Sequence, residues 1–289
     1  ALLAEAGGVP EQSRERALEN AEGVVIASPS ARHYQDLADV AAAGRHVFME
    51  KPLAHTDTGL EEILGQYDRQ GRIVFAGLNL RFHPAAETAR RVVAEARLGK
   101  ILWARFQFSD YLPNWRPHQD HRRGYTADAA TGGVMFDVIH EFDLANYILG
   151  PAETVAAACR NSGTLGILAE DSAEVILRHE GGVLSTLHLD YVTRPRRRVA
   201  EIAGTEGGLR LDLDARTVSI IDLEGAVIEA ITDDGAYADD YEAEIKSFLS
   251  CMTGRQSPPC DGWQALDILR QVLAARCRCG LPETDTANI

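Results

Sequence analysis

The chain has 289 residues and a formal net charge of −14, so its length favours two domains over one. This acidic balance argues against a nucleic-acid partner, because binding phosphates requires a basic surface. The five cysteines form no CxxC pair, and the sequence shows neither a signal-peptide pattern nor an apolar stretch long enough to span a membrane. We therefore expect a cytoplasmic protein with reduced thiols, no membrane partner and no metal site.

The first 80 residues alternate between apolar runs and amphipathic segments. Runs at 24–27, 46–49 and 73–76 resemble buried parallel strands, and the segments between them have helical periodicity that ends at Gly44 and Gly71. Strands and helices joined by short connections are typical of a doubly wound parallel sheet. The pattern predicts a partial dinucleotide-binding Rossmann domain over residues 1–80.

The pattern changes along the rest of the chain, where strand-like runs predominate. They lie at 101–109, 153–160, 173–179, 183–191, 198–203, 208–213 and 217–221. Glycine pairs at 181–182 and 207–208 predict hairpin turns, and helical segments at about 240–254 and 262–278 close the chain. We expect an α+β substrate-binding and oligomerisation domain over residues 81–289, with a large, mostly antiparallel sheet. The C-terminal helices are expected to pack back on the first domain.

Polar residues follow the first-domain strands directly, at Ser28-Pro29-Ser30, Glu50-Lys51-Pro52 and 78–84. Ligands bind outside the carboxyl ends of the strands of an open parallel sheet, so these segments together predict a binding crevice. Lys51 is one of only three lysines beside 26 arginines, which makes it a poor candidate for routine surface charge. Lysine, unlike arginine, can also be tuned towards neutrality by burial.

A second candidate cluster lies in the segment Gly132–Asp143, where Asp137, His140 and Asp143 interrupt an apolar helix. One interpretation is a buried, hydrogen-bonded core histidine. The other is a general base whose pKa a neighbouring carboxylate sets near neutrality. Metal binding is the weaker functional alternative, because the segment lacks a HExxH pattern.

One basic run, at Arg194 and 196–198, stands out from the acidic background. We expect it to be a solvated strand end or a subunit contact in preference to an anion site.

Several of these segments together resemble the Gfo/Idh/MocA oxidoreductase family. They are residues 27–33 (ASPSARH), residues 44–53 (GRHVFMEKPL) and the Gly132-Gly133 helix that carries His140 and Asp143. The resemblance covers essentially the whole chain. It implies NAD or NADP as cofactor and hydride transfer at a secondary carbinol of a sugar, nucleotide-sugar or cyclitol.

The resemblance also implies roles for individual residues. His140 would take the hydroxyl proton, Lys51 would donate to the substrate oxygen, and Asp137 would orient or tune one of them. The nicotinamide ribose would be bordered by Ser28, Pro29, His33, Glu50 and Lys51. A likeness to a branch associated with cell-surface carbohydrate synthesis adds a substrate set of Asn79, Arg81, His83, Trp115, Asp120, Arg122 and Tyr125. Trp115, with Tyr111, suits either a platform for a sugar ring or packing at the rim.

Two features depart from the family pattern. The sequence contains no GxGxxG fingerprint, and Ala1–Val9 resembles the helix after a second Rossmann strand, so we expect the sequence to be truncated by about one β-α-β unit. The cofactor's 2′-phosphate preference would be read in that unit, so NAD and NADP both remain open. Asp137 also stands three residues before His140, where many family members have four, which leaves its role open.

Three functions remain open at this point. The favoured one is NAD(P)-dependent oxidation of a carbohydrate CH–OH group. An NAD-assisted elimination or glycoside cleavage and a non-catalytic sugar or nucleotide sensor are the alternatives. Because an antiparallel sheet with one open face needs a cover, we expect a homodimer or homotetramer built on that sheet.

Overall fold

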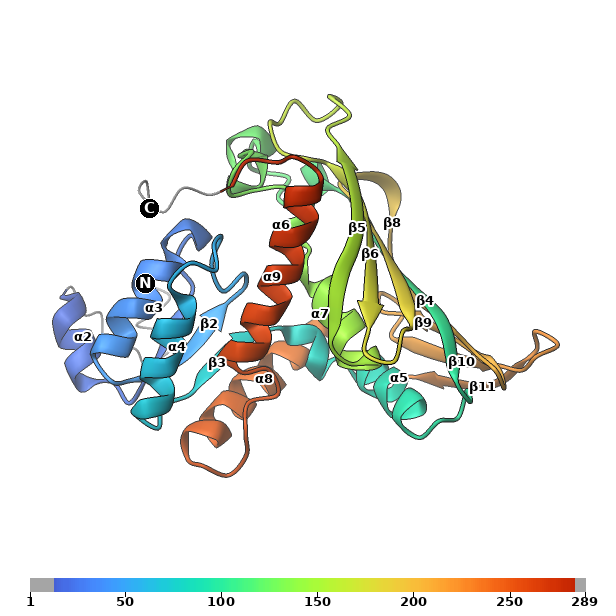
Figure 1. Ribbon diagram of the computed structural model, residues 1–289, viewed down its shortest axis with the longest axis horizontal. Helices are drawn as coiled ribbons and strands as arrows, with labels where there is room; N and C mark the ends of the chain where they lie inside the picture. The colour runs from blue at the N-terminus through green and yellow to red at the C-terminus, as the bar shows by residue number, and fades with distance from the viewer. Residues whose placement is uncertain (1–12, 284–289) are drawn as a thin grey trace.

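The computed structural model of the protein describes residues 13–283. The expected helix at Ala1–Val9 lies outside these residues. Two sheets organise the chain, and helices pack between and beside them (Figure 1). The α/β class, with a parallel sheet and a larger mixed sheet, confirms the sequence prediction.

The smaller sheet is parallel and comes from the N-terminal part of the chain. Its strands are β1 (Gly23–Ile26), β2 (His46–Glu50) and β3 (Val74–Gly77), in that order across the sheet. Its helices are α2 (Arg14–Asn20), α3 (His33–Ala42) and α4 (Leu60–Arg69), with 3-10 turns η1 (Ser30–Arg32) and η2 (Asn79–Phe82) after two of the strands. Apolar side chains on α3 and α4, such as Leu37 and Leu64, are fully buried. This burial holds both helices in the core and leaves the strand ends at one edge.

The larger sheet has eight strands in the order β11-β10-β9-β8-β4-β7-β6-β5. They are β4 (Ile101–Tyr111), β5 (Ala152–Arg160), β6 (Ser172–His179), β7 (Leu184–Asp190), β8 (Val192–Gly204), β9 (Gly208–Asp212), β10 (Thr217–Ile221) and β11 (Val227–Thr232). Neighbours pair antiparallel except β4 and β7, which are parallel. Alternating side chains are buried along β4, including Ala104, Phe106 and Phe108. The face they occupy is therefore the core face.

Helices cover that core face. They include α5 (Pro84–Ala94), α6 (Val134–Asp137), α7 (Ile139–Leu149) and α9 (Gly262–Arg278), while α8 (Tyr237–Met252) lies beside η2. Three more 3-10 turns, η3 (Leu112–Asn114), η4 (His121–Arg123) and η5 (Tyr125–Ala127), connect β4 to α6. Figure 1 shows α9 standing between the two sheets, and it contacts both β5 and β3. The backbone N–H of Ala76 donates to the carbonyl of Cys260, so the segment before α9 extends the edge of β3. No helix of the described residues is long and apolar enough to cross a membrane.

The expected helix through the Gly132-Gly133 segment is broken in two. Val138, with φ −101° and ψ 29°, separates α6 from α7. Asp137 therefore ends one helix and His140 lies in the first turn of the next, so the helical spacing predicted for the pair does not hold. The structure also adds strand β11 and begins β8 at Val192, whereas the sequence pattern placed that strand's start at residue 198.

The two glycines are required by close oxygen atoms, a buried carboxylate at Gly133 and backbone carbonyls at Gly132. Gly133 has φ +92°, and a Cβ there would lie 2.1 Å from an oxygen of Glu170. A Cβ at Gly132 would lie 2.4 Å from the carbonyl oxygen of Tyr125. Only glycine allows the backbone to approach this closely in such conformations.

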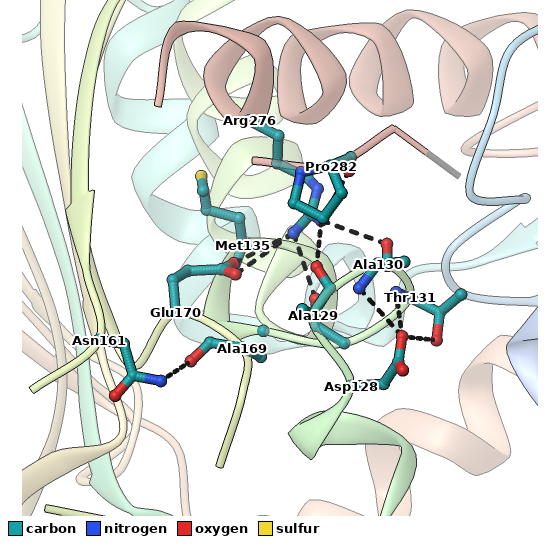
Figure 2. Close-up of polar contacts among 12 residues, drawn as sticks. Asp128, Ala129, Ala130, Thr131, Met135, Asn161, Ala169, Glu170, Arg276 and Pro282 are labelled. Carbon is teal, nitrogen blue, oxygen red and sulfur yellow. Dashed lines mark hydrogen bonds and ion pairs between the residues drawn. The ribbon is translucent and has the colours of Figure 1, made fainter. Parts of the chain in front are cut away.

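Arg276, near the end of α9, fixes the same region from the other side (Figure 2). Its guanidinium lies 3.3 Å from an oxygen of Glu170 and donates to the carbonyls of Ala129 and Ala130 at 2.9 and 3.2 Å. The backbone N–H of Met135 donates to Glu170 in turn, at 3.2 Å. Both charged groups are almost fully buried. The C-terminal helix thus anchors the loop that leads into α6 and Asp137.

Replacing Arg276 by methionine should therefore lower the free energy of unfolding by about 3 kcal/mol, because Glu170 would be left as an uncompensated buried charge. Urea unfolding followed by circular dichroism measures the change. Arg278→Met is the matched control, since Arg278 bonds only a carbonyl of its own helix, and it should stay within about 0.5 kcal/mol of the parent. Equal losses in the two variants would show that the buried pair does not stabilise the fold.

Candidate active site

A cavity of about 670 Å³ opens at the carboxyl ends of β1 and β2, where an open parallel sheet binds its ligands. The large sheet, α6 and α8 form its other walls. The lining side chains that matter for chemistry are Ser28, Pro29, His33, Glu50, Lys51, His55, Phe108, Trp115, Arg116, Tyr125, Asp137, His140, Arg196, Arg198, Tyr237 and Tyr241. Two of the three strand ends from which the sequence predicted a crevice thus border a cavity shared by both parts of the protein, whereas residues 78–84 are not in its lining.

Lys51 projects from the end of β2 and binds the last residue of α6. Its Nζ donates to the backbone carbonyl of Asp137 at 2.6 Å and to the Asp137 carboxylate at 3.0 Å. An ammonium carries three N–H groups, so these bonds leave one for a ligand in the cavity. The side chain is one-fifth exposed, which keeps that donor accessible.

Asp137 is itself held by two tyrosines. The hydroxyl of Tyr125 donates to Oδ1 at 3.0 Å, and the hydroxyl of Tyr191 donates to Oδ2 at 3.1 Å. Burial raises the pKa of each tyrosine, and the neighbouring Asp137 carboxylate raises it further. Both hydroxyls therefore remain protonated donors at neutral pH. The three donors restrain the carboxylate that receives Lys51.

His140 lines the cavity from the first turn of α7. Its Nδ1 is buried and has no hydrogen-bond partner within the described part of the chain. Burial lowers the pKa of His140 well below its ordinary value, and the nearby cations Lys51 and Arg198 lower it further. The imidazole is therefore neutral near pH 7 and able to accept a proton.

The residues expected beside the nicotinamide also line the cavity, and two of them tie its rim together. The His33 ring bridges the backbone oxygens of Pro52, at 2.7 Å, and Ser28, at 3.0 Å. The Ser28 hydroxyl donates to Asp36 on α3 at 2.5 Å. These contacts fix the ends of β1 and β2 relative to one another, while Pro29 and Glu50 face the cavity.

Three of the expected substrate-binding residues lie away from the cavity. Nε and Nη2 of Arg81 donate to the buried Asp143 carboxylate at 2.9 and 2.7 Å. His83 caps α5 by accepting from the Ala85 N–H and meets the Leu213 carbonyl with its other nitrogen. Asn79 is buried where η2 begins. The polar groups of Arg81 and His83 thus bond within the fold, whereas Nδ2 of Asn79 has no partner among the described residues; none of the three lines the cavity.

Asp120 and Arg122, also expected to bind substrate, do not line the cavity. Both oxygens of Asp120 accept from the Arg122 guanidinium, at 2.8 and 2.9 Å, in the exposed turn η4. The hydrogen-bonding groups of these two side chains are thus paired with one another within the turn. Of the expected substrate set, only Trp115 and Tyr125 reach the cavity wall.

Several lining residues were missed by the sequence reading. Arg196 and Arg198 belong to the basic run, for which a solvated strand end or subunit contact was preferred; both line the cavity. The sequence pattern began this strand at residue 198, six residues too late. With the correct start, the spacing of two residues places Arg196 and Arg198 on one face of the strand. Tyr237 and Tyr241 also line the cavity, one helical turn apart on α8. They belong to none of the sequence motifs that pointed to the other site residues.

Two protein-family descriptions match separate parts of the chain. Residues 3–78 match the "Oxidoreductase family, NAD-binding Rossmann fold", and residues 86–210 match the "GFO/IDH/MocA C-terminal domain". The chain belongs to the Gfo/Idh/MocA oxidoreductase family. The resemblance drawn from the EKP segment and the Gly-Gly helix is confirmed.

Curated relatives of this Gfo/Idh/MocA oxidoreductase carry names of carbohydrate enzymes. It is 29% identical over 265 residues to a 1,5-anhydro-D-fructose reductase of Ensifer adhaerens, covering 88% of this chain and 77% of the relative. It is 26% identical to a myo-inositol 2-dehydrogenase of Thermotoga maritima, covering 84% and 73%. Among solved structures, the WlbA dehydrogenase of Bordetella pertussis, in complex with NADH and UDP-GlcNAcA, has a TM-score of 0.78 at 23% identity and covers 96% and 83%. That likeness supports the fold.

A buried carboxyl group stands behind the cavity wall on α8. Glu244 is almost fully buried, and its Oε1 has no hydrogen-bond partner in the described chain. Burial is the main cause that raises the pKa of Glu244, to about 8, and the carboxylates of Glu50 and Asp143 raise it further. Because Glu50 lines the cavity, the charge of Glu244 affects the site.

This pKa predicts how stability changes with pH. The folded Glu244 keeps its proton up to about pH 8, whereas an unfolded glutamate releases it near its ordinary pKa of 4.5. Between these values the folded state holds the extra proton, so the free energy of unfolding falls as pH rises. Glu244→Gln should leave stability unchanged near pH 4.5 and increase it by roughly 2–4 kcal/mol at pH 8.

Urea unfolding at both pH values tests this prediction. Glu242→Gln, on the same helix and ion-paired on the surface with Lys246, is the matched control and should show no such pH-dependent gain. A Glu244→Gln variant that is equally displaced from the parent at both pH values would contradict the raised pKa.

Proposed function

We propose that this protein catalyses reversible hydride transfer between a nicotinamide cofactor and a secondary carbinol of a sugar, nucleotide-sugar or cyclitol. The observation that carries the proposal is the convergence of Lys51, Asp137 and His140 on one cavity at the carboxyl ends of the parallel strands. The names of the relatives, among them a 1,5-anhydro-D-fructose reductase and a myo-inositol 2-dehydrogenase, support this substrate class.

The residues at the strand ends fit the nicotinamide end of such a cofactor. Pro29 and Glu50 face the cavity beside Lys51, and the His33 bridge fixes the two loops that carry them. The 289 residues contain no GxGxxG sequence, so the proposal assigns no residue to the pyrophosphate. When bound, the cofactor supplies the hydride acceptor, or the donor in the reverse direction.

The side chains supply the proton chemistry. The third N–H of Lys51 donates to the substrate oxygen and stabilises the negative charge that develops there as the O–H bond breaks; that charge is relieved when the hydride leaves the carbon and the carbonyl forms. Neutral His140 takes the hydroxyl proton and becomes an imidazolium. Asp137, restrained by Tyr125 and Tyr191, orients the Lys51 ammonium and balances its charge. The proton thus leaves on the protein, and the electron pair leaves with the hydride.

We also propose that two or more copies associate through the outer face of the large sheet, as expected from the sequence. Trp103 and Leu184 are register partners on β4 and β7, and both side chains are almost half exposed there. Joining two such faces would remove this apolar surface from water. The cysteines of the chain are all free thiols, which suits the proposed cytoplasmic location.

Substituting either proposed catalytic residue should abolish most turnover without unfolding the protein. Lys51→Met and His140→Asn should each lower kcat by about 10²- to 10⁴-fold in NADH formation with a panel of sugars and cyclitols. Lys100→Met and His118→Asn change exposed residues of the same types and should keep parental rates. A substituted enzyme with near-parental kcat would remove that residue from the mechanism. Product formation without net NADH would indicate redox-neutral elimination.

The protonation state of His140 can be measured directly. The NMR titration of His140 should have its midpoint well below 6.5, since burial and two cations oppose its charge. His188 is an internal contrast, because hydrogen bonds to Asp190 and Glu174 raise its pKa to about 9. In the oxidation direction, kcat/KM should therefore hold a plateau through pH 6.5 and fall only in more acidic solution. A His140 midpoint at or above 6.5 would contradict this assignment of the base.

A further inference from the structure

The wall of the cavity formed by the large sheet is unusually rich in hydrogen-bond donors. Arg196 and Arg198 stand two residues apart on β8, so their side chains share one face of the strand. Both guanidinium groups lie against the ring of Phe108, at 5.5 and 5.2 Å from its centre. Trp115 packs edge-on against the same ring at 5.8 Å. All four residues line the cavity.

Arg198 is the central group of this wall. Its side chain is only 7% exposed, and its Nε donates to the fully buried Glu141 at 2.7 Å. Within the described chain, its two terminal nitrogens have no protein acceptor, although a guanidinium carries four N–H groups there. A purely structural ion pair at such depth would be expected to satisfy those donors. The cavity that Arg198 lines is where an acceptor for these N–H groups can bind.

The carboxylates that contact the arginines of this wall each hold a guanidinium, and the one oxygen of Glu141 without a partner in the described chain, Oε2, is fully buried. Asp110 and Asp214 accept from Arg196 at 3.2 and 3.0 Å, and Glu141 accepts from Arg198. The indole Nε1 of Trp115 adds a buried donor that has no partner among the described residues. A sugar hydroxyl brings a donor of its own and needs an acceptor, whereas carboxylate and phosphate oxygens only accept. The forked guanidinium also matches the two oxygens of such a group.

We infer that the substrate carries an anionic group, a carboxylate or a phosphate, which binds Arg198 with help from Arg196 and Trp115. This inference rests on the proposed function and narrows its substrate class to acidic or phosphorylated carbohydrates. Glu141, Asp110 and Asp214 hold the arginines in place and offset their charge before the ligand arrives. The basic run of the sequence thus contributes an anion site, the less favoured of its two sequence-based interpretations.

Calorimetric titration of the full chain with ligands that share one sugar ring tests the inference without any cofactor. Glucose is the neutral member, and glucuronate, glucose 6-phosphate and UDP-glucose carry a carboxylate, a phosphate monoester and a diphosphate. At least one anionic ligand should bind about 10-fold more tightly than glucose, and added KCl should weaken that preference. The anion that gains most identifies the source of the charge. Glucose binding as tightly as all three would overturn the inference.

Variants of Arg198 and Trp115 test whether these residues cause the preference for an anionic ligand. Arg198→Lys keeps a cation beside Glu141 but loses the fork, and should reduce the preference for the anion about 10-fold while glucose affinity stays unchanged. Trp115→Phe removes the indole N–H group together with one ring of the indole and keeps an aromatic ring at this position, so it provides a second test if Arg198→Lys fails to fold. Arg197→Met is the matched control, because Arg197 lies exposed on the opposite face of β8 and should bind all ligands as the parent does. Equal loss of glucose and anion binding in Arg198→Lys and Trp115→Phe would overturn the inference.

The same protein separates this inference from the proposed function. Anion-selective binding with no NAD-linked oxidation of any ligand would retain the anion site and reject the dehydrogenase. Oxidation of glucose and its anionic relatives with equal kcat/KM would retain the dehydrogenase and reject the anion site.

Discussion

The bond between Lys51 and Asp137 joins the two halves of the protein at the place where chemistry is proposed. Lys51 leaves the end of a parallel strand, and Asp137 ends a short helix that packs on the large sheet. The ammonium bonds both the backbone carbonyl and the carboxylate of that residue, so its orientation depends on the position of the helix as well as on the carboxylate charge. Tyr125, Tyr191 and the anchored glycine loop restrain the carboxylate in turn. A shift of one sheet relative to the other would therefore change this bond.

Three cations that line the cavity are each paired with a carboxylate. Lys51, Arg196 and Arg198 reach the surface of the cavity, and each is paired with a carboxylate that lies behind it or beside it. The cations therefore stay oriented in a protein whose net charge is −14. Two of them also keep His140 neutral by lowering its pKa, which links the wall proposed to bind an anion with the group proposed to take a proton. An anion bound at Arg198 would partly offset that cation and raise the proton affinity of His140.

Local patterns predicted most of the fold. Apolar runs bounded by glycine gave the three parallel strands and most of the large sheet, because burial on both faces or on one face leaves a direct periodicity in the sequence. They did not predict the parallel pairing of β4 with β7, which depends on where strands far apart in the chain meet. The break at Val138 was missed because no glycine or proline marks it between residues 134 and 143. Lys51 and His140, selected by motif and position, both line the cavity. Arg81 and His83 do not, because they belong to or follow a 3-10 turn that the sequence does not reveal.

The hydrogen bonds of Lys51 have a stereochemical consequence. Two of its three N–H groups are committed to Asp137, and tetrahedral geometry then leaves one direction for the third. A substrate oxygen that meets this ammonium must approach along that line, from within the cavity that Lys51 and His140 both line. The position of that oxygen relative to the strand ends is then fixed by the bonds of Lys51 to Asp137. The choice between a sugar and its epimer at the neighbouring carbon falls to the side chains that contact the rest of the ring.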